Sequence, residues 1–445
     1  MKPTHLSPSW RPSPRIRTRC PSRAFSSTPH RLIIKDIADL PARTKPTYAQ
    51  SPQATLLSLQ WPTPPRNILI TKKKRTPGIT SSLIEYTTHL SSTYPAINII
   101  VEPESAAEIH DAVPFPVYTY EPSAENGMRT LLSDKTDLIC TLGGDGTILR
   151  ASSLFSHSAT VPPILSFAMG TLGFLGEWKF GEYKRAFREV YMSGASDAYA
   201  NLSLPDGRSE QPNSSDPLDQ PLSYADIRGK SMGSSRTSRI LLRNRIKVGV
   251  FGPDGTRINS PADRDTYALN EVIVHRGMSP HLKIVDVFVG GRFLTEGVAD
   301  GMIISSPTGS TAYSLSSGGS IVHPLVPSLL LTPICPRSLS FRPLVLPANT
   351  PITLRLGEKN RGREVDVSID GKRMPGGMGV GMQVRVLGEE VRTADGEWVG
   401  GVPSIVRGTT GMPGGESEED HWVGGLNALL KFNYPFGDQD SEGRR

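Results

Sequence analysis

The feature that most constrains the fold is a regular alternation of short apolar runs and helical stretches in the first half of the chain. The apolar runs have the length of buried strands, and a helical stretch near 81–90 separates the first two. Strands that alternate with helices are typical of a doubly wound α/β domain with a parallel sheet. We therefore predict an N-terminal, Rossmann-like α/β domain over 66–200. Its expected strands lie at 67–71, 97–101, 137–142 and 163–167.

The second half of the chain has a different pattern. Residues 201–238 are rich in Ser, Asp, Pro and Gln, which predicts a disordered insertion or linker. Beyond them, short strand-like runs are divided by Gly and Pro, as in an all-β sandwich. We expect a C-terminal β-sandwich domain over 239–405, so the fold class is α/β plus all-β. The expected strands lie at 246–250, 268–275, 284–289, 302–305, 352–356, 365–369 and 384–387.

The remaining segments lie at the two ends. Residues 1–25 are rich in Arg and Ser and contain no acid, which is the composition of a mitochondrial transit peptide, or alternatively of a disordered basic tail. Residues 26–65 are expected to form a flexible extension. Toward the C-terminus, glycine-rich and acidic residues predict a linker over 406–420, and apolar residues predict a docking segment over 421–436.

Charge and cysteine content exclude several classes of protein. Lys and Arg outnumber Asp and Glu by 49 to 43, but the basic residues of the first 35 positions account for the excess, so the rest of the chain is nearly neutral. A nucleic-acid partner is therefore not expected. No uncharged apolar run approaches the roughly 18 residues that a membrane span needs. The three cysteines form no Cys-x-x-Cys pair, which argues against a disulfide scaffold or a cysteine zinc site.

The string Gly143-Gly144-Asp145-Gly146-Thr147 follows the apolar run at 137–142 directly. In an open α/β sheet, ligands bind where strands end, and glycines allow backbone amides to approach phosphate oxygens. Asp145 could orient a hydroxyl, accept its proton or hold Mg²⁺. The alternative is a tight turn with an ordinary aspartate.

Two further blocks carry polar side chains beside apolar runs. Residues 300–314 enter a turn dense with hydroxyls, which suits a sugar-bearing ligand or is simply a structural turn. Asn270 and Glu271 interrupt the apolar run 267–276, which is costly if they are buried without partners. A ribose diol would supply such partners. The alternative is a strand whose Glu271 faces solvent.

Four blocks together resemble the signatures of the NAD kinase family in their order and spacing. They are Gly143 to Thr147, Gly170-Thr171-Leu172-Gly173-Phe174-Leu175, Ala268 to Glu271, and Ser306-Pro307-Thr308-Gly309-Ser310-Thr311-Ala312-Tyr313-Ser314. The resemblance covers about 66–405 without the insertion. Two more stretches, 331–343 and 426–436, together with the N-terminal segment, resemble the fungal mitochondrial NADH kinases within that family.

The resemblance implies transfer of the γ-phosphoryl group of ATP, with Mg²⁺, to the 2′-hydroxyl of the adenosine ribose of NAD or NADH. It implies that Asp145 is the general base or orienting carboxylate and that the site lies between the two domains. It also implies a mitochondrial matrix location, a preference for NADH and self-association into a homo-oligomer. The implied nucleotide-binding residues are Gly143, Gly144, Gly146, Thr147, Phe174, Asn270, Glu271, Asp300, Thr311, Ala312, Tyr313, Ser316 and Asp370.

Two other functions remain open at this point. Lipid kinases of the diacylglycerol or sphingosine type also use a Gly-Gly-Asp-Gly loop, although no amphipathic membrane-binding helix is evident here. A non-catalytic NAD(H)-binding sensor would keep the fold without turnover. The retention of Asp145 argues against a sensor.

Overall fold

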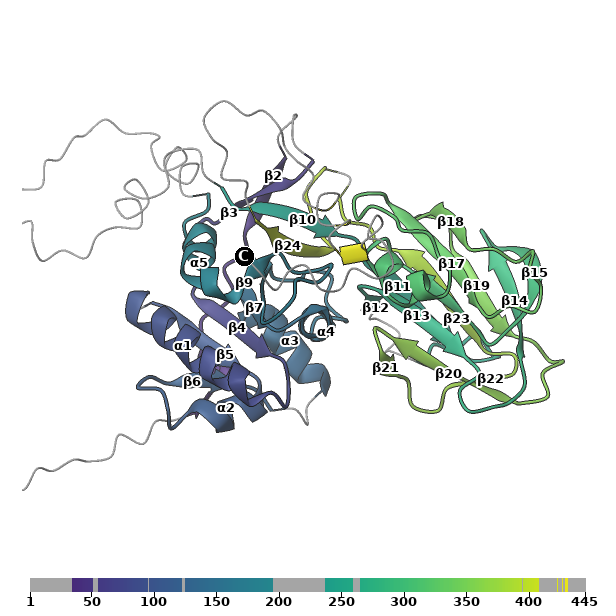
Figure 1. Cartoon of the computed structure of the whole chain (residues 1–445), viewed down its shortest axis with the longest axis horizontal. Coiled ribbons are helices and arrows are strands. Elements are labelled where there is room, and N and C mark those ends of the chain that lie inside the picture. Colours follow the sequence, from purple (N-terminus) through teal and green to yellow (C-terminus); the bar gives the residue numbers. More distant parts are fainter. Residues whose placement is uncertain are drawn as a thin grey trace, which may run out of the picture.

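The computed structural model describes residues 34–50, 55–94, 96–121, 125–194, 237–258, 265–393 and 395–407, together with positions 422, 426, 429 and 430. The described chain forms two lobes that lie side by side (Figure 1). One is an α/β domain and the other is built from antiparallel strands. The predicted α/β plus all-β fold is confirmed.

A mixed sheet forms the centre of the α/β domain. Its core is parallel, and the last strands on one side are antiparallel. Strand β7, which precedes the glycine string, lies between two parallel neighbours and is buried along its whole length. The order is β1 (Ile34–Asp36), β6 (Val117–Thr119), β5 (Asn98–Val101), β4 (Asn67–Lys72), β7 (Leu138–Leu142), β8 (Ile164–Ala168), β24 (Val402–Val406), β10 (Arg239–Arg243), β3 (Leu57–Gln60) and β2 (Thr47–Gln50), with β9 (Trp178–Lys179) beside β8.

Helices cover both faces of this sheet because successive strand residues point to opposite faces. In β4, Ile68 and Ile70 pack with α1, α2 and α5, whereas Leu69 packs with α3 and α4. The apolar runs are therefore continuous rather than alternating, as in other sheets buried on two sides. The helices are α1 (Pro77–Thr93), α2 (Pro103–Ile109), α3 (Glu125–Lys135), α4 (Asp145–Ser153) and α5 (Tyr183–Tyr191), with 3₁₀ turns η1 (Ile37–Asp39) and η2 (Phe180–Glu182).

The sheet extends beyond the boundaries expected from the sequence. Strands β1, β2 and β3 come from the segment predicted as a flexible extension over 26–65, which from Ile34 onward contributes to the sheet. The two ends of the range assigned to the sandwich domain, 239–405, form strands β10 and β24, which instead pair with each other in the α/β sheet. They are mostly buried, so the pairing adds to the core of the α/β domain.

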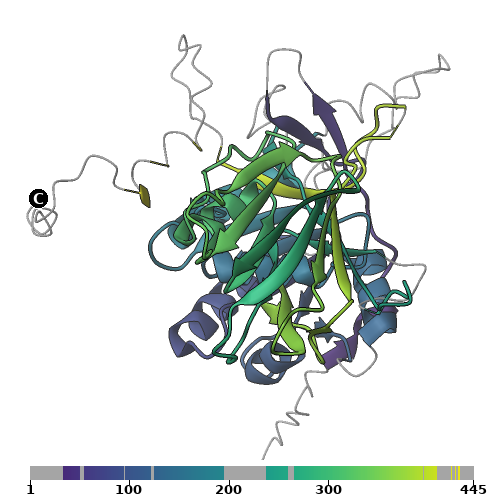
Figure 2. The ribbon, with the colours of Figure 1, turned by 90° about the vertical axis from the view of Figure 1, so that its right-hand side faces the viewer.

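The second lobe is a sandwich of two antiparallel sheets whose inner faces pack together, with alternate residues of each strand directed inward. Figure 2 shows this lobe facing the viewer. One sheet is β12 (Thr266–Ala268), β11 (Ile246–Phe251), β23 (Gln383–Gly388), β19 (Ile352–Leu356), β14 (Lys283–Val289) and β15 (Arg292–Ala299). The other is β18 (Leu344–Pro347), β17 (Ser328–Ile334), β16 (Gly301–Ser305), β13 (Glu271–His275), β20 (Glu364–Ile369) and β21 (Lys372–Arg373), with β22 (Met378–Gly379) beside β20.

A single strand was expected over 268–275, and this prediction is wrong. The chain leaves β12 at Ala268 and enters β13 at Glu271, and these strands belong to different sheets. The break lies at Leu269 and Asn270, where the side chain of Asp370 accepts the backbone N–H bonds that a strand neighbour would otherwise accept. The polar pair therefore lies at a corner between the two sheets.

No helix in the described ranges is both long and apolar enough to cross a membrane. The predicted transit peptide at 1–25 and nearly all of the insertion at 201–238 lie outside the described residues. Of the docking segment at 421–436, the ring of Trp422 lies edge-on to His323, with 4.8 Å between the ring centroids.

Candidate active site

The glycine string forms the turn between β7 and α4, with Gly144 as the N-terminal cap of the helix. Gly143 packs closely, because a Cβ there would lie 2.1 Å from Oγ1 of the buried Thr147. Gly144 and Gly146 are exposed, and among the described residues nothing lies within 4 Å of where their Cβ atoms would be. The turn thus presents open backbone at the positive end of a helix, which suits an anion.

Asp145 is held by the second glycine-containing block. Its Oδ2 accepts the N–H of Phe174 at 2.9 Å, and its Oδ1 accepts the N–H of Leu175 at 3.1 Å. A Cβ at Gly173 would lie 2.2 Å from Oδ1, so only glycine leaves room for the carboxylate there. Phe174 is thus placed beside Asp145 through its backbone, and a ligand contact of its ring stays a prediction.

Sequence reasoning missed a lysine next to the turn. Lys73 follows β4, and its N–H donates to the carbonyl of Leu142 at 2.8 Å, at the end of β7. Its Cβ lies 3.3 Å from the Cβ position of Gly143, and its side chain is exposed with no ion pair among the described residues. Its neighbours Lys72 and Lys74 are paired with glutamates of α2. The signal was the basic run 72–75 immediately after the first predicted strand.

Asp370 shapes the corner that carries Asn270 and Glu271. Its carboxylate accepts the N–H groups of Leu269, Asn270 and Glu271 at 2.6, 2.8 and 3.1 Å. Asp370 adopts a left-handed backbone with φ of 46°, in the tight turn between β20 and β21. Burial raises the pKa of Asp370, and these backbone hydrogen bonds act against that rise. The geometry gives Asp370 a structural function here, and its predicted nucleotide contact stays untested.

Four buried side chains around this corner have a polar atom without a hydrogen-bond partner among the described residues. They are Asn270 (Oδ1), Glu271 (Oε2), Ser305 (Oγ) and Thr308 (Oγ1). Ser305 lies directly opposite Glu271 in the β13–β16 ladder, so their side chains share a face. Unpaired buried polar atoms are costly, and a cluster of them fits a polar ligand. Sequence reasoning had included Ser305 and Thr308 in the hydroxyl-rich block 300–314 but had not named either as a binding residue.

Glu271 is the group whose titration this environment changes most clearly. Burial, with a smaller effect of the nearby Asp370, raises the pKa of Glu271 to about 8. A neutral carboxyl can donate one hydrogen bond and accept others. Glu271 can therefore act toward sugar hydroxyls as donor and acceptor.

The hydroxyl-rich block packs against the same corner. Ser306 donates to the carbonyl of Leu269 at 2.5 Å, and a Cβ at Gly309 would lie 2.2 Å from the carbonyl oxygen of Asn270. The predicted binding residues Thr311, Ala312, Tyr313 and Ser316 continue from there along η3 (Thr308–Thr311) and α8 (Tyr313–Ser316) toward the surface, where Tyr313 and Ser316 are exposed.

The two domains bring the corner and the glycine string together. Leu269 packs in one apolar cluster with Ile148 of α4 and with Leu175, which holds Asp145. The N–H of Tyr267 donates to the carbonyl of Ser156, just beyond α4. Figure 1 shows α4 on the side of the α/β domain that faces the sandwich. Asp145 and the polar corner thus both border the domain junction.

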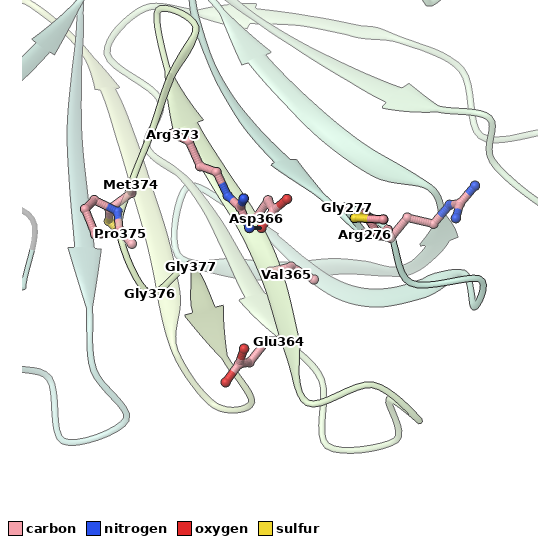
Figure 3. A pocket seen from close by; sticks show the side chains of 11 residues that line it. Arg276, Gly277, Glu364, Val365, Asp366, Arg373, Met374, Pro375, Gly376 and Gly377 are labelled. Atoms are coloured by element: carbon pink, nitrogen blue, oxygen red, sulfur yellow. Dashed lines mark hydrogen bonds and ion pairs between the residues drawn. The ribbon is translucent and has the colours of Figure 1, made fainter.

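Within one chain, Asp300 lies apart from Asp145 and from the polar corner. It directly precedes β16, at the end opposite Ser305 and five residues away, or about 17 Å at about 3.3 Å per residue. Its carboxylate pairs with Arg276 at 2.6 Å. Arg276 also lines a pocket of about 580 Å³ near Asp366 and Arg373 on the sandwich (Figure 3). None of the predicted site residues lines this pocket.

No group of three or more His, Cys, Asp or Glu side chains suited to a metal occurs in the described ranges. Mg²⁺ commonly binds to nucleotide phosphates and waters with only one or two carboxylates. Asp145 beside an anion-binding turn fits that arrangement.

A doubly wound domain with a glycine turn at its strand ends, joined to a sandwich that offers buried polar groups, defines a two-domain nucleotide-binding enzyme. Family models match both lobes: the ATP-NAD kinase N-terminal domain over 69–195 and the C-terminal domain over 269–381. The chain therefore belongs to the ATP-NAD kinase family and is an NAD(H) kinase. This excludes the lipid-kinase alternative.

Individual relatives agree over most of their length. The chain is 35% identical to the mitochondrial NADH kinase POS5 of Saccharomyces cerevisiae, over 91% of this chain and 89% of that protein. It is 37% identical to the mitochondrial NADH kinase pos5 of Schizosaccharomyces pombe, over 91% and 86%. The crystal structure of yeast NADH kinase complexed with NADH superposes with a TM-score of 0.69 at 34% identity, covering 91% of this chain and 98% of that one.

Proposed function

We propose that this enzyme transfers the γ-phosphoryl group of ATP to the 2′-hydroxyl of the adenosine ribose of NADH, and less efficiently of NAD, in the mitochondrial matrix. The observation that carries the proposal is the cluster of unpaired polar atoms on Asn270, Glu271, Ser305 and Thr308. It is supported by Leu269, next to Asn270, which shares an apolar cluster with Leu175, whose N–H holds Asp145. Transfer of a phosphoryl group to a sugar hydroxyl needs a carboxylate close to the polar groups that hydrogen-bond the sugar.

The acceptor ribose binds at the polar corner. Asn270 and Glu271 hydrogen-bond its hydroxyls, with Ser305 and Thr308 beside them. This contact orients the 2′-hydroxyl toward Asp145, whose carboxylate accepts a hydrogen bond from it. The carboxylate takes the proton as the new bond to phosphorus forms and the bond to the bridging oxygen breaks, which releases ADP. Two backbone amides hold the carboxylate, so it is oriented before the substrate arrives.

The donor phosphates bind at the glycine turn. Amides of Gly144 and Gly146 and the N-terminus of α4 bind phosphate oxygens, and Lys73 neutralises part of their charge. The N–H of Gly143 donates to the carbonyl of Phe167, so Gly143 contributes close packing of the turn rather than an amide. Mg²⁺ bound with the phosphates would supply charge neutralisation for phosphoryl transfer, and Asp145 would be the acid that helps to hold it.

The NADH preference and the matrix location rest on similarity to proteins named mitochondrial NADH kinases. Reduction alters the nicotinamide, far from the hydroxyl that is phosphorylated. Discrimination therefore depends on packing at the other end of the ligand, where one contact is worth about 1–3 kcal/mol, or roughly 10–200-fold.

The experiment incubates the full chain with γ-labelled ATP, Mg²⁺ and either NAD or NADH, and measures label in NADP or NADPH. We expect transfer to both, with a higher kcat/KM for NADH. Equal or higher kcat/KM for NAD would contradict the NADH preference alone. Binding of NADH without any transfer would instead support the sensor.

A further inference from the structure

Arg243, at the end of β10, is a buried cation that the mechanism above does not use. Its side chain is among the largest that are fully buried, with 2% exposure. Nε donates to Oγ of Ser404 at 3.2 Å, and Nη2 donates to the carbonyl of Phe174 at 3.3 Å. No carboxylate lies within ion-pair distance of it among the described residues. A buried charge whose hydrogen bonds go only to neutral acceptors is expensive even where the more distant carboxylates of Glu177 and Asp145 act on it, so its retention calls for a reason.

The hydrogen bonds show where that charge acts. The peptide unit between Phe174 and Leu175 accepts from Arg243 through its carbonyl and donates to Oδ1 of Asp145 through its N–H. One peptide dipole thus connects the guanidinium to the carboxylate, and hydrogen bonds in such chains strengthen one another. Burial lowers the pKa of Arg243 to about 10, against the effects of Glu177 and Asp145. Arg243 therefore stays charged at neutral pH.

We propose that Arg243 is a positioning residue for phosphoryl transfer: through the Phe174–Leu175 peptide it fixes the orientation of the Asp145 carboxylate and places a positive charge behind it. The inference rests on the proposed function, because it requires Asp145 to act on the acceptor hydroxyl.

Arg245 offers a matched comparison. It lies two residues further along and is equally buried, with 2% exposure. It pairs with Glu389 and donates to the carbonyls of Phe155, Ser158 and Ala159. These contacts join the domains, and none of them involves the peptides that hold Asp145. Arg245 therefore has the same burial without the connection to the carboxylate.

The test is a double-mutant cycle in the full chain, with kcat and KM measured for NADH and ATP. Arg243→Lys should lower kcat by about 10–100-fold and change either KM by less than about 3-fold, because the interaction acts in the transition state. In an Asp145→Asn background the same substitution should lower kcat by less than about 3-fold. Arg245→Lys should change kcat by about the same factor in the wild-type background and in the Asp145→Asn background.

An equal loss from Arg243→Lys in both backgrounds would overturn the proposal, since a purely structural arginine would behave in that way. If Asp145→Asn alone leaves kcat unchanged, the catalytic function of Asp145 fails instead, and the two failures are distinct. Should Arg243→Lys not fold, Ser404→Ala carries the test, because it removes the other anchor of the guanidinium. It should lower kcat by about 2–10-fold only when Asp145 is present.

Discussion

At the scale of the residue, Asp145 differs from an ordinary turn aspartate because two backbone amides orient both of its oxygens. We predict that Asp145→Asn lowers kcat by about 10²–10⁴-fold, the usual range for general acid–base catalysis, and changes the affinity for NADH far less. Steady-state kinetics and NADH fluorescence titration measure the two effects. Asp254→Asn, in an exposed turn, is the control. A near wild-type rate for Asp145→Asn would make the glycine turn a binding element only.

Lys73 and Lys74 are adjacent and both basic, yet only Lys73 adjoins the glycine turn. We predict that Lys73→Met raises KM for ATP by about 10-fold, because one cation beside the phosphates is lost. Lys74→Met, which breaks an exposed ion pair with Glu104, should leave KM for ATP within about 2-fold. Similar KM values for ATP in the two variants would remove Lys73 from the phosphate site.

The pKa of Glu271 gives a prediction about stability. Because its folded pKa of about 8 lies above the ordinary value of 4.5 for a glutamate, the folded state holds a proton that the unfolded state releases. The stabilising contribution is complete below about pH 4.5 and is lost as pH rises toward 8. Asp370, whose pKa is also raised, acts in the same direction.

Glu271→Gln removes this titration. Without nucleotide, the variant should therefore gain free energy of unfolding relative to the wild type between pH 5 and pH 8, by at most about 1.4 kcal/mol per pH unit. Urea unfolding at several pH values measures the difference, with the exposed Glu364→Gln as control. A difference between wild type and Glu271→Gln that stays constant with pH would contradict the prediction.

At the scale of the element, the turn that follows β8 holds the Asp145 carboxylate. We predict that Gly173→Ala lowers kcat by about 10-fold or more, because the added Cβ would overlap Oδ1 of Asp145 and displace it. Gly170→Ala, in the same turn, adds a Cβ with nothing described within 4 Å and should leave kcat nearly unchanged. Melting temperatures of both variants separate misplacement of Asp145 from loss of folding.

Elements that depend only on residues close together in the sequence could be predicted from the sequence. Strands β4, β5, β7 and β8 follow from continuous apolar runs, and the glycine turn follows from its composition. The break between β12 and β13 could not be read in the same way, because its cause is Asp370, 100 residues away from Asn270 along the chain. Ser305 was missed for a similar reason, since only the register of β16 against β13 places it opposite Glu271.

At the scale of the whole molecule, residues 1–25 lie outside the described structure but have a testable function. We predict that they carry a fluorescent reporter into mitochondria, because dense Arg and the absence of acids suit import. A fusion in which the arginines of 1–25 are replaced by glutamine should stay in the cytosol. Cytosolic signal from the unaltered fusion would contradict the prediction.

The pairing of β24 with β8 and β10 also has a consequence for the order of events during synthesis. The ribosome makes β8 and β10 early, but Val402–Val406, the strand between them, emerges only after the entire sandwich. The first lobe can start to fold while the chain grows, yet its sheet stays divided until the second lobe has been made. A nascent chain arrested before residue 402 would therefore hold Asp145 and its turn in an incomplete sheet, and binding competence should arise late and in a single step.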